Sequence, residues 1–364
     1  MKKILFAAHD LDLGGIETAL VTLANYLVEK NYDVTIALEK KEGEFLQRLQ
    51  KEIHVIEYNT NAHKNIVIRK LCNLRNRLKF IIKYRNQFDF SASFATYSLA
   101  SSFMARTASQ NSALWCHADY LTLYHGNKEE MRTFFKNVFC DKFKHIVFVS
   151  KEGANSFIES FPNLKDKVIT CNNLINGRDI ITKSKEQIEE DYIQEIIKKE
   201  IPIFLNVGRH DERQKKLTRI IEASKKLKEE NHLFKVLFIG DGKDTKLYQE
   251  KVKEYHLEDT ILFLGRKENP YPYFRISDCV ILSSEYEGYP VVYLESFVLN
   301  KPMITTKVSD YEQVENGRGM VVEKDTQAIY IAMKQFLQNG YKIKDDFDYE
   351  IYNANILRIL ETIM

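Results

Sequence analysis

The sequence predicts an α/β protein with two doubly wound domains, each built on a parallel sheet. Three observations lead to this expectation. Short apolar runs rich in β-branched residues alternate with segments of helical periodicity along most of the chain. Two of these runs end in a glycine-containing loop that leads into a helical segment. The chain has 364 residues, enough for two separate cores, and a highly charged stretch lies near its middle.

The expected elements follow this alternation. We expect a first domain over residues 1–176, a linker with a surface helix over 177–200, a second domain over 201–345 and a terminal helix over 346–364. Strands of the first domain are expected at 4–8, 33–38, 54–58, 92–97, 113–116, 145–150 and 168–173. Strands of the second domain are expected at 201–207, 235–240, 261–266, 278–283 and 301–306.

Composition excludes several classes of protein. With 44% hydrophobic residues, 29% charged residues and a net charge of +2, the chain gives no electrostatic argument for nucleic acid as a partner. It has no apolar run long enough for a transmembrane helix, and His9, Asp10 and Asp12 interrupt the N-terminal apolar run before any signal-peptide cleavage site. The five cysteines are odd in number and form no C-x2-C pair, which favours a reducing compartment, by default the cytoplasm, and argues against structural zinc.

A glycine pair, Gly14 and Gly15, follows the first expected strand and opens the first expected helix. Backbone N–H groups and the helix dipole make such a loop suitable for an anion. The G-x-G-x-x-G spacing is absent, which argues against a dinucleotide-dependent oxidoreductase. Asp10 and Asp12 form a D-x-D, a metal-binding motif elsewhere, but here it precedes a glycine loop at the first strand, so we attribute it to chance.

A strongly basic segment extends from Lys64 to Arg85 and contains no Asp or Glu. Its cations are Lys64, Arg69, Lys70, Arg75, Arg77, Lys79, Lys83 and Arg85. Apolar residues interleave with them, as in an amphipathic helix. Two interpretations stay open. The helix either packs on the core and exposes a solvated basic face, or it binds anionic phospholipid headgroups or a lipid-diphosphate acceptor.

Polar residues follow two of the expected strands. His117 comes directly after the strand at 113–116, and the carboxyl end of a parallel strand is where ligands bind, although a purely structural histidine is the alternative. Gly208 and Arg209 follow the strand at 201–207, and a Lys-Lys pair at 215–216 precedes the next helix. This loop favours a diphosphate, because the Arg fork and the Lys point charge both neutralise phosphate oxygens.

The stretch from Ser284 to Glu295 is expected to form a tight turn and a helix after the strand at 278–283. Pro290 suits the first turn of that helix, and Gly288 lets the backbone approach a ligand closely. Glu287 lies in the turn, with Glu295 about two helical turns further along. Ionised carboxylates only accept hydrogen bonds, so this pair suits a ligand rich in hydroxyl groups.

Glu287-Gly288-Tyr289-Pro290 followed by Glu295 resembles the E-x7-E motif of retaining GT-B glycosyltransferases of the family-four type. The resemblance spans nearly the whole chain. It implies the GT-B fold, with two Rossmann-like domains facing a cleft and a final helix that returns to the N-terminal domain. It also implies that Glu287 contacts the donor sugar, that Gly288 and Tyr289 belong to the donor-binding turn, and that Glu295 holds the ribose hydroxyls of the nucleotide.

The N-terminal half carries its share of the resemblance. Gly14 and Gly15 resemble the family's glycine loop, which faces the donor phosphates and the acceptor. His117 resembles the histidine that lies near the 6-hydroxyl of the donor sugar. The resemblance implies that domain closure brings these three residues onto the donor.

The C-terminal half departs from the family pattern at one point. Arg209 and Lys215 resemble residues of the family's G-R-x-x-x-x-K-G loop, but one residue is inserted and Lys216 stands where the family has its second glycine. Alignment on the following helix favours Lys215 as the catalytic lysine, and Lys216 stays open. Arg266 and Lys267 lie where backbone groups of the family pair with the nucleobase.

The function implied is a retaining, metal-independent transfer of a hexose or N-acetylhexosamine. The donor is a nucleotide-diphosphate sugar, with uridine favoured over guanosine, and the acceptor is a hydroxyl of a glycan or a lipid-linked acceptor in surface-polysaccharide synthesis. Glu287, His117, Arg209 and Lys215 are the expected catalytic residues, and neither a cofactor nor a metal is expected. The alternatives are a nucleotide-sugar epimerase or hydrolase on the same scaffold, and a non-catalytic subunit that binds a partner enzyme or a glycan.

Overall fold

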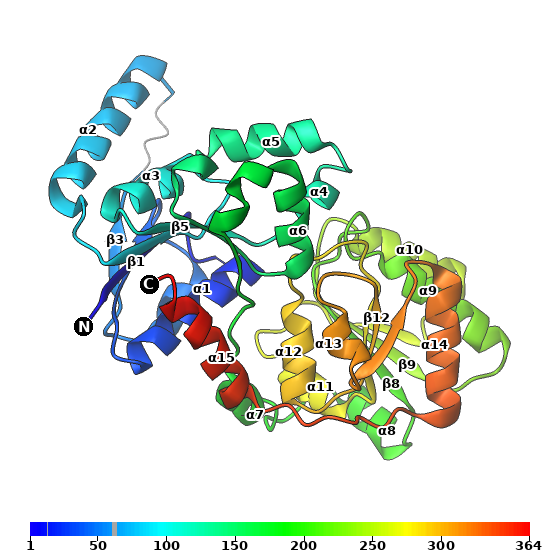
Figure 1. Cartoon of the computed structure of the whole chain (residues 1–364). Coiled ribbons are helices and arrows are strands. Elements are labelled where there is room, and N and C mark those ends of the chain that lie inside the picture. The colour runs from blue at the N-terminus through cyan, green and yellow to red at the C-terminus, as the bar shows by residue number, and fades with distance from the viewer. Residues whose placement is uncertain (13, 60–63) are drawn as a thin grey trace. The chain divides into compact units, whose positions relative to one another are not determined.

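The computed structural model describes residues 1–12, 14–59 and 64–364. Contacts divide the chain into two compact units, Met1–Ile175 with Asn353–Met364, and Asn176–Tyr352. Each unit is a parallel sheet with helices packed against it (Figure 1). Among the described residues, no helix is long and apolar enough to cross a membrane.

The first unit holds a seven-stranded sheet in the order β3-β2-β1-β4-β5-β6-β7, with every pairing parallel. The strands are β1 Lys3–Ala8, β2 Asp33–Leu38, β3 His54–Glu57, β4 Phe90–Ser93, β5 Ser112–Cys116, β6 His145–Phe148 and β7 Val168–Thr170. Its helices are α1 Gly15–Glu29, α2 Ile66–Tyr84, α3 Leu99–Ala108, α4 Tyr120–Leu123, α5 Lys128–Asn137 and α6 Lys151–Ser160.

The second unit holds a six-stranded parallel sheet in the order β10-β9-β8-β11-β12-β13. The strands are β8 Ile203–Val207, β9 Lys235–Ile239, β10 Ile261–Phe263, β11 Cys279–Leu282, β12 Met303–Thr306 and β13 Gly319–Val322. Its helices are α7 Gly177–Lys183, α8 Asp191–Lys198, α9 Leu217–Glu229, α10 Thr245–Glu254, α11 Tyr271–Ile276, α12 Val291–Val298, α13 Glu312–Glu315 and α14 Thr326–Asn339.

The central strands are buried along almost their whole length, as expected for parallel strands covered on both faces. In the second unit the strand order reverses between β8 and β11. In an open α/β sheet, ligands bind outside the carboxyl ends of the strands at such a reversal. The loops that follow β8 and β11 contain Arg209, Lys215 and Glu287, so the topology places these three residues at one point of the sheet edge.

The terminal helix α15 spans Tyr349–Glu361, and its residues from Asn353 onward belong to the first unit. Asn353 ties it there, since its amide accepts from Ile175 N at 3.1 Å and donates to Ile175 O at 2.7 Å. Asn111 adds a hydrogen bond to the Ile363 carbonyl at 2.7 Å. The segment expected as a linker, 177–200, consists of α7 and α8, and both belong to the second unit.

Several expected strands differ from those of the structure. The strands expected at 145–150, 168–173 and 261–266 end earlier, at Phe148, Thr170 and Phe263. The strand expected at 92–97 is β4, which ends at Ser93. Ser93 pairs with Ala7 on one side, where β1 ends one residue later at Ala8, whereas β5 on the other side continues to Cys116. No strand was expected at 319–322, yet β13 pairs there with β12 at the edge of the sheet.

Candidate functional site

The loop after β8 approaches the loop after β9 backbone to backbone. Gly240 has φ of 139°, and a Cβ at this position would lie 1.9 Å from the Gly208 carbonyl oxygen. A Cβ on Gly242 would lie 2.3 Å from the His210 carbonyl oxygen. Hydrogen bonds from Gly208 N to Ile239 O at 3.0 Å and from His210 N to Asp241 O at 3.0 Å hold the two loops together. Glycine at 240 and 242 therefore fixes where the residues after β8 lie.

Lys216 caps the start of α9 with a left-handed φ of 52°. Glycine adopts this conformation most readily. The family's G-R-x-x-x-x-K-G loop has glycine at this position, where this chain has Lys216. Lys215 instead runs over Gly208, with its Cε 3.5 Å from the position of a Cβ on that glycine. The Lys216 ammonium lies 4.0 Å from Glu212. This geometry favours Lys215 as the lysine of the site.

Glu287 is the centre of the polar contacts in this unit. The Lys215 ammonium lies 2.6 Å from its Oε1, and the Ser284 hydroxyl donates to the same oxygen at 2.7 Å. Gln214 Nε2 donates to the other carboxylate oxygen at 3.3 Å. Ser309 donates to the Glu287 backbone carbonyl at 2.6 Å, so the residue is held from both ends. Glu287 is 7% exposed, and such a buried charge is stable only because it is paired and hydrogen-bonded.

Arg209 joins this group through a single amide. Its guanidinium donates to Gln214 Oε1 at 3.0 Å, while the amide nitrogen of Gln214 faces Glu287. Arg209 is exposed. Two cations, Arg209 and Lys215, thus flank one buried carboxylate, and the exposed one is available to an anionic ligand.

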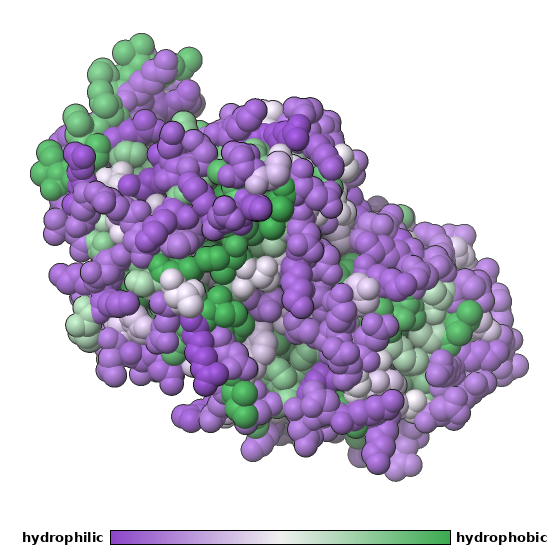
Figure 2. Space-filling view, in the orientation of Figure 1, coloured by the Kyte–Doolittle hydropathy of each residue, from purple (hydrophilic) through white to green (hydrophobic). Residues whose placement is uncertain are grey.

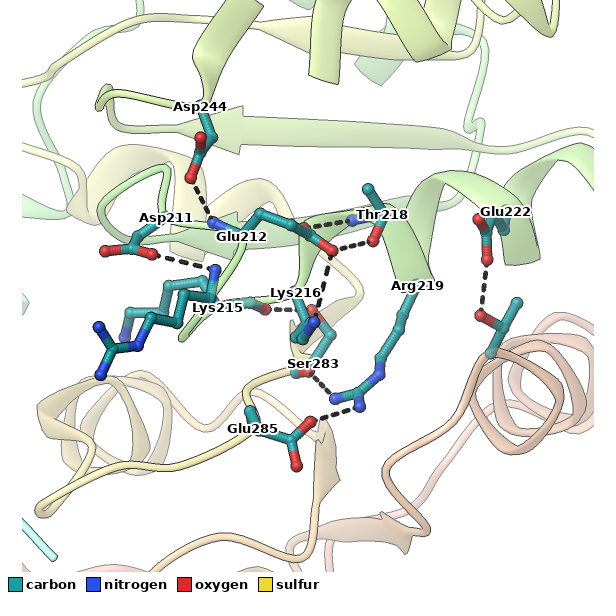
Figure 3. A network of polar contacts seen from close by, with 12 residues as sticks. Asp211, Glu212, Lys215, Lys216, Thr218, Arg219, Glu222, Asp244, Ser283 and Glu285 are labelled. Carbon is teal, nitrogen blue, oxygen red and sulfur yellow. Dashed lines mark hydrogen bonds and ion pairs between the residues drawn. The ribbon is translucent and has the colours of Figure 1, made fainter. Parts of the chain in front are cut away.

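Arg219 of α9 ties this helix to the loop after β11 (Figure 3). From α9 it donates to the Ser283 carbonyl at 3.0 Å and pairs with Glu285 at 2.5 Å. The Ser283 hydroxyl donates to the Lys215 carbonyl at 2.8 Å. Arg219 therefore holds the turn that leads to Glu287, and Ser283 connects this turn to the backbone of Lys215.

Helix α12 presents its first turn beside this group. Pro290 is its N-cap, and no described side chain caps its free N–H groups, which leaves them open to an anion. The Tyr289 side chain is buried, and its hydroxyl donates to Gln313 at 2.8 Å. Tyr289 was expected at the donor. With its phenol occupied, only its backbone is available there, as is that of the neighbouring Gly288.

Glu295 lies on the second turn of α12 and accepts a hydrogen bond from the Tyr271 hydroxyl at 3.3 Å. Burial raises the pKa of the Glu295 carboxyl to about 7, and the hydrogen bond from Tyr271 offsets part of that rise. Near neutral pH this carboxyl therefore exchanges between an acceptor-only carboxylate and a protonated form.

The loop after β10 carries Arg266, which is exposed and follows Gly265 at φ of 66°. The pKa of Asp241 in the loop after β9 lies below its usual range, first because Thr245 and the Gly242 N–H donate to it and also because of the Arg266 charge. Lys267 is bound to Glu190 and lies 5.6 Å from the Tyr273 ring. Of this pair, Arg266 alone is exposed.

In the first unit, His117 follows β5, and its ring lies 4.5 Å from that of Phe94. Burial lowers its pKa to about 3, and a hydrogen bond to the Phe94 backbone counters this in part. Nε2 is buried and has no hydrogen-bond partner among the described residues, so the bond to Phe94 is made by Nδ1–H. His117 is therefore a neutral imidazole with an unused acceptor nitrogen.

The glycine pair opens α1 in the same unit. Gly14 is the N-cap in extended conformation, and no described side chain caps this helix. A Cβ on Gly15 would meet nothing within 4 Å, so the space beside it is open. Asp10 accepts from the Asp12 N–H at 3.2 Å, a local turn contact. Within the described ranges, the D-x-D belongs to no cluster of three potential metal ligands.

Sequence reasoning missed three residues of the site, Gln214, Ser284 and Arg219. Gln214 and Ser284 contact Glu287 directly, and Arg219 holds the turn. In the sequence Arg219 looks like any solvated cation of an amphipathic helix. In the sequence, these three residues could have been suspected only because they lie within a few positions of Lys215, Lys216 or Glu287.

Comparison with known proteins gives the family. A model of "Glycosyl transferases group 1" matches residues 187–354, and a model of "Glycosyltransferase Family 4" matches residues 13–176. An uncharacterized glycosyltransferase of Methanocaldococcus jannaschii is 31% identical over 166 residues, which is 45% of this chain and 40% of that protein. The amylovoran biosynthesis glycosyltransferase AmsD of Erwinia amylovora is 21% identical over 92% of this chain and 89% of that protein.

Solved structures share the fold. The structure of Anabaena Alr3699/HepE in complex with UDP and glucose has a TM-score of 0.75 at 16% identity, and the match covers 100% of both chains. At this level of identity the likeness concerns the fold alone. The arrangement of two parallel sheets with helices is the GT-B fold, as the resemblance implied.

Proposed function

Because this chain belongs to the glycosyltransferases of the GT-B fold that these two family models describe, we propose that it is a retaining, metal-independent sugar transferase. It transfers a hexose or N-acetylhexosamine from a nucleotide-diphosphate sugar to a hydroxyl of a glycan or lipid-linked acceptor in surface-polysaccharide synthesis. One observation carries the proposal: Arg209, Lys215 and Glu287 meet at the point where the strand order of the second unit reverses.

The donor is recognised by charge and by hydroxyl groups. Arg209, Lys215 and the uncapped start of α12 bind the diphosphate, since each supplies donors to phosphate oxygens. Glu295 accepts the ribose hydroxyls, and Glu287 accepts hydroxyls of the sugar. Uridine is the favoured base, in keeping with the UDP bound to the structural neighbour HepE. Arg266 lies on the loop proposed to contact the base.

The chemistry lies in the departure of the nucleoside diphosphate. As the bond between the anomeric carbon and the phosphate oxygen breaks, negative charge builds up on the diphosphate, and Lys215 and Arg209 stabilise it. These two cations do the work that a metal ion does in other transferases. With retention, the acceptor oxygen attacks the face that the diphosphate leaves, and a phosphate oxygen takes the acceptor proton. His117 in the first unit supplies a neutral acceptor for a sugar hydroxyl.

The location is part of the same proposal. The five cysteines are all free thiols, as in a reducing compartment, and we propose the cytoplasm, with peripheral attachment to the inner face of the plasma membrane.

A donor screen tests the function. Nucleotide release from UDP- and GDP-sugars is measured with and without EDTA on the wild type, on Glu287→Ala and on a control, Glu258→Ala, which alters an exposed carboxylate of the same unit. We expect release from a UDP-sugar that persists in EDTA, is lost in Glu287→Ala and is kept in Glu258→Ala. NMR of the product would give the anomeric configuration. Loss of release in EDTA would overturn metal independence, and no binding of any nucleotide by calorimetry would favour a non-catalytic subunit.

A further inference from the structure

Helix α2 packs on the first unit with a narrow face. Along its 19 residues, Phe80 is the only buried one, and its ring lies 5.7 Å from Tyr58 and 6.0 Å from Phe103. Asn76 donates to the Asn59 carbonyl at 2.7 Å. The residues at 73, 76, 80 and 84 recur every three or four positions and form this inward face. The core contacts of α2 therefore use a small part of its surface.

A second face of α2 is apolar and exposed. Five large residues recur every three or four positions and are each more than half exposed: Val67 65%, Leu71 62%, Leu74 54%, Leu78 51% and Ile82 85%. With 3.6 residues per turn, this outer stripe lies on the side of the helix opposite to Phe80. Figure 2 shows hydrophobic side chains gathered over α2. The helix thus carries an apolar stripe along its whole length, about 28 Å at 1.5 Å per residue.

Cations border the outer stripe on both sides. Arg75, Lys79 and Lys83 recur every four residues along one border, and Lys70 lies along the other. Arg77 points inward instead, over the Phe103 ring at 5.3 Å. No ion pair joins any cation of α2 to a described carboxylate, and residues 64–85 contain no Asp or Glu. The exposed apolar stripe therefore lies in an uncompensated positive field.

We propose that α2 is a membrane-docking helix that lies in the plane of an anionic phospholipid surface. The outer stripe enters the boundary between headgroups and acyl chains, and the bordering cations meet the lipid phosphates. The sequence left two interpretations of the basic segment open, and the exposed stripe favours lipid. The proposal does not depend on the transfer reaction, since docking needs neither donor nor acceptor.

The charge also decides between a membrane and a second copy of the chain. Packing two outer stripes against each other would bring two sets of unpaired cations together, and like charges side by side oppose that contact. An anionic lipid surface offers negative charge along both borders of the stripe at once. No described helix is long and apolar enough to span a bilayer. The proposed contact is between α2 and the membrane surface.

Vesicle flotation without donor or acceptor tests the docking. The full chain is mixed with phosphatidylcholine vesicles, with or without phosphatidylglycerol. We expect flotation with the anionic vesicles only, weakened by salt. An apolar variant, Leu74→Ser/Leu78→Ser/Ile82→Ser, and a charge variant, Arg75→Glu/Lys79→Glu/Lys83→Glu, should each reduce binding at least about tenfold.

Two matched controls separate the outer stripe from general surface properties. Leu233→Ser/Ile331→Ser/Ile351→Ser removes equally exposed apolar residues from elsewhere in the chain. Lys198→Glu/Lys246→Glu/Lys253→Glu reverses three exposed cations of the second unit. Both controls should float like the wild type, and all variants should keep the wild-type circular dichroism spectrum. Failure of the wild type to prefer anionic vesicles would overturn the proposal. So would equal losses in the controls, or a loss of self-association in the apolar variant with vesicle binding unchanged.

Discussion

The ammonium of Lys215 lies 2.6 Å from Oε1 of Glu287. The cation proposed for the diphosphate and the carboxylate proposed for the sugar are thus paired in the free protein. Both are largely buried, with side chains 17% and 8% exposed. A diphosphate that draws Lys215 toward itself would leave Glu287 an acceptor for sugar hydroxyls, with the serine and glutamine contacts still in place. Binding the nucleotide and orienting the sugar are coupled through this pair.

The pairing of Lys215 with Glu287 predicts that the losses of stability in the two single variants are not additive. Lys215→Met leaves a buried carboxylate without its cation, and Glu287→Gln leaves a buried ammonium without its anion, so each should lower the free energy of unfolding by roughly 1–3 kcal/mol. The double variant removes both charges and should lose less than the sum, by at least about 0.5 kcal/mol. Urea unfolding measures the cycle. The exposed pair of Lys246 and Glu250, 3.8 Å apart, is the control, and its single variants should stay within about 0.5 kcal/mol. Strict additivity at Lys215 and Glu287 would contradict the coupling.

The clamp made by Arg219 predicts a loss of activity from a residue outside the donor site. Arg219→Met should lower the rate of nucleotide release by up to about 100-fold, because the turn that carries Glu287 loses its fixed approach to Lys215. Arg219→Lys keeps the charge but not the fork that reaches both Ser283 and Glu285, so it should recover part of the rate. Arg358→Met, in an exposed helical arginine, is the control. If Arg219→Lys released nucleotide no faster than Arg219→Met, the charge retained by lysine would not contribute to holding the turn.

The sequence predicted those parts of the fold and site that rest on local signals. The strand at 33–38 was predicted to the residue, because its β-branched run is bounded by turn residues. Glu287 and Arg209 stood out because they follow strands in charged, glycine-containing loops. The fold class follows from alternation alone, without any knowledge of contacts.

What the sequence could not predict depends on residues distant in the chain. Gln214 and Ser284 matter because the β8 and β11 loops meet, which no local pattern records. β4 ends at Ser93 although Phe94 and Tyr97 suit a strand, and the end of its neighbour β1 at Ala8 is a feature of pairing that no local pattern records. The outer stripe of α2 has the spacing of a core face, and only the structure shows that it is exposed. Periodicity identifies an apolar face but not what covers it.

The close contact between the backbones of Gly208 and Gly240 predicts that a single added methyl group displaces the loop after β8, which is proposed to bind the diphosphate. Gly240→Ala would place Cβ 1.9 Å from the Gly208 carbonyl oxygen at φ of 139°, and should destabilise the protein by more than about 2 kcal/mol. Gly126→Ala also has positive φ, 79°, but its Cβ would meet nothing within 4 Å, so it should cost only about 1–2 kcal/mol. Thermal unfolding compares the two, and calorimetry of nucleotide binding should show a loss in Gly240→Ala alone. Equal effects of the two variants would mean that backbone strain, not the contact with Gly208, decides.

The raised pKa of Glu295 predicts opposite pH dependences for stability and for donor binding. Its folded pKa, about 7, lies above the ordinary 4.5, so the unfolded chain loses this proton first as the pH rises. Between these two values the folded state holds more protons, and its stability falls with rising pH. The ribose hydroxyls need the carboxylate as an acceptor, so affinity for the nucleotide sugar should instead rise up to a pH of about 7 and then level off. Calorimetry across this range on the wild type and on Glu295→Gln tests both. The variant should bind weakly at every pH and lose the stability slope, whereas a wild-type affinity that does not change with pH would show that Glu295 does not hold the ribose.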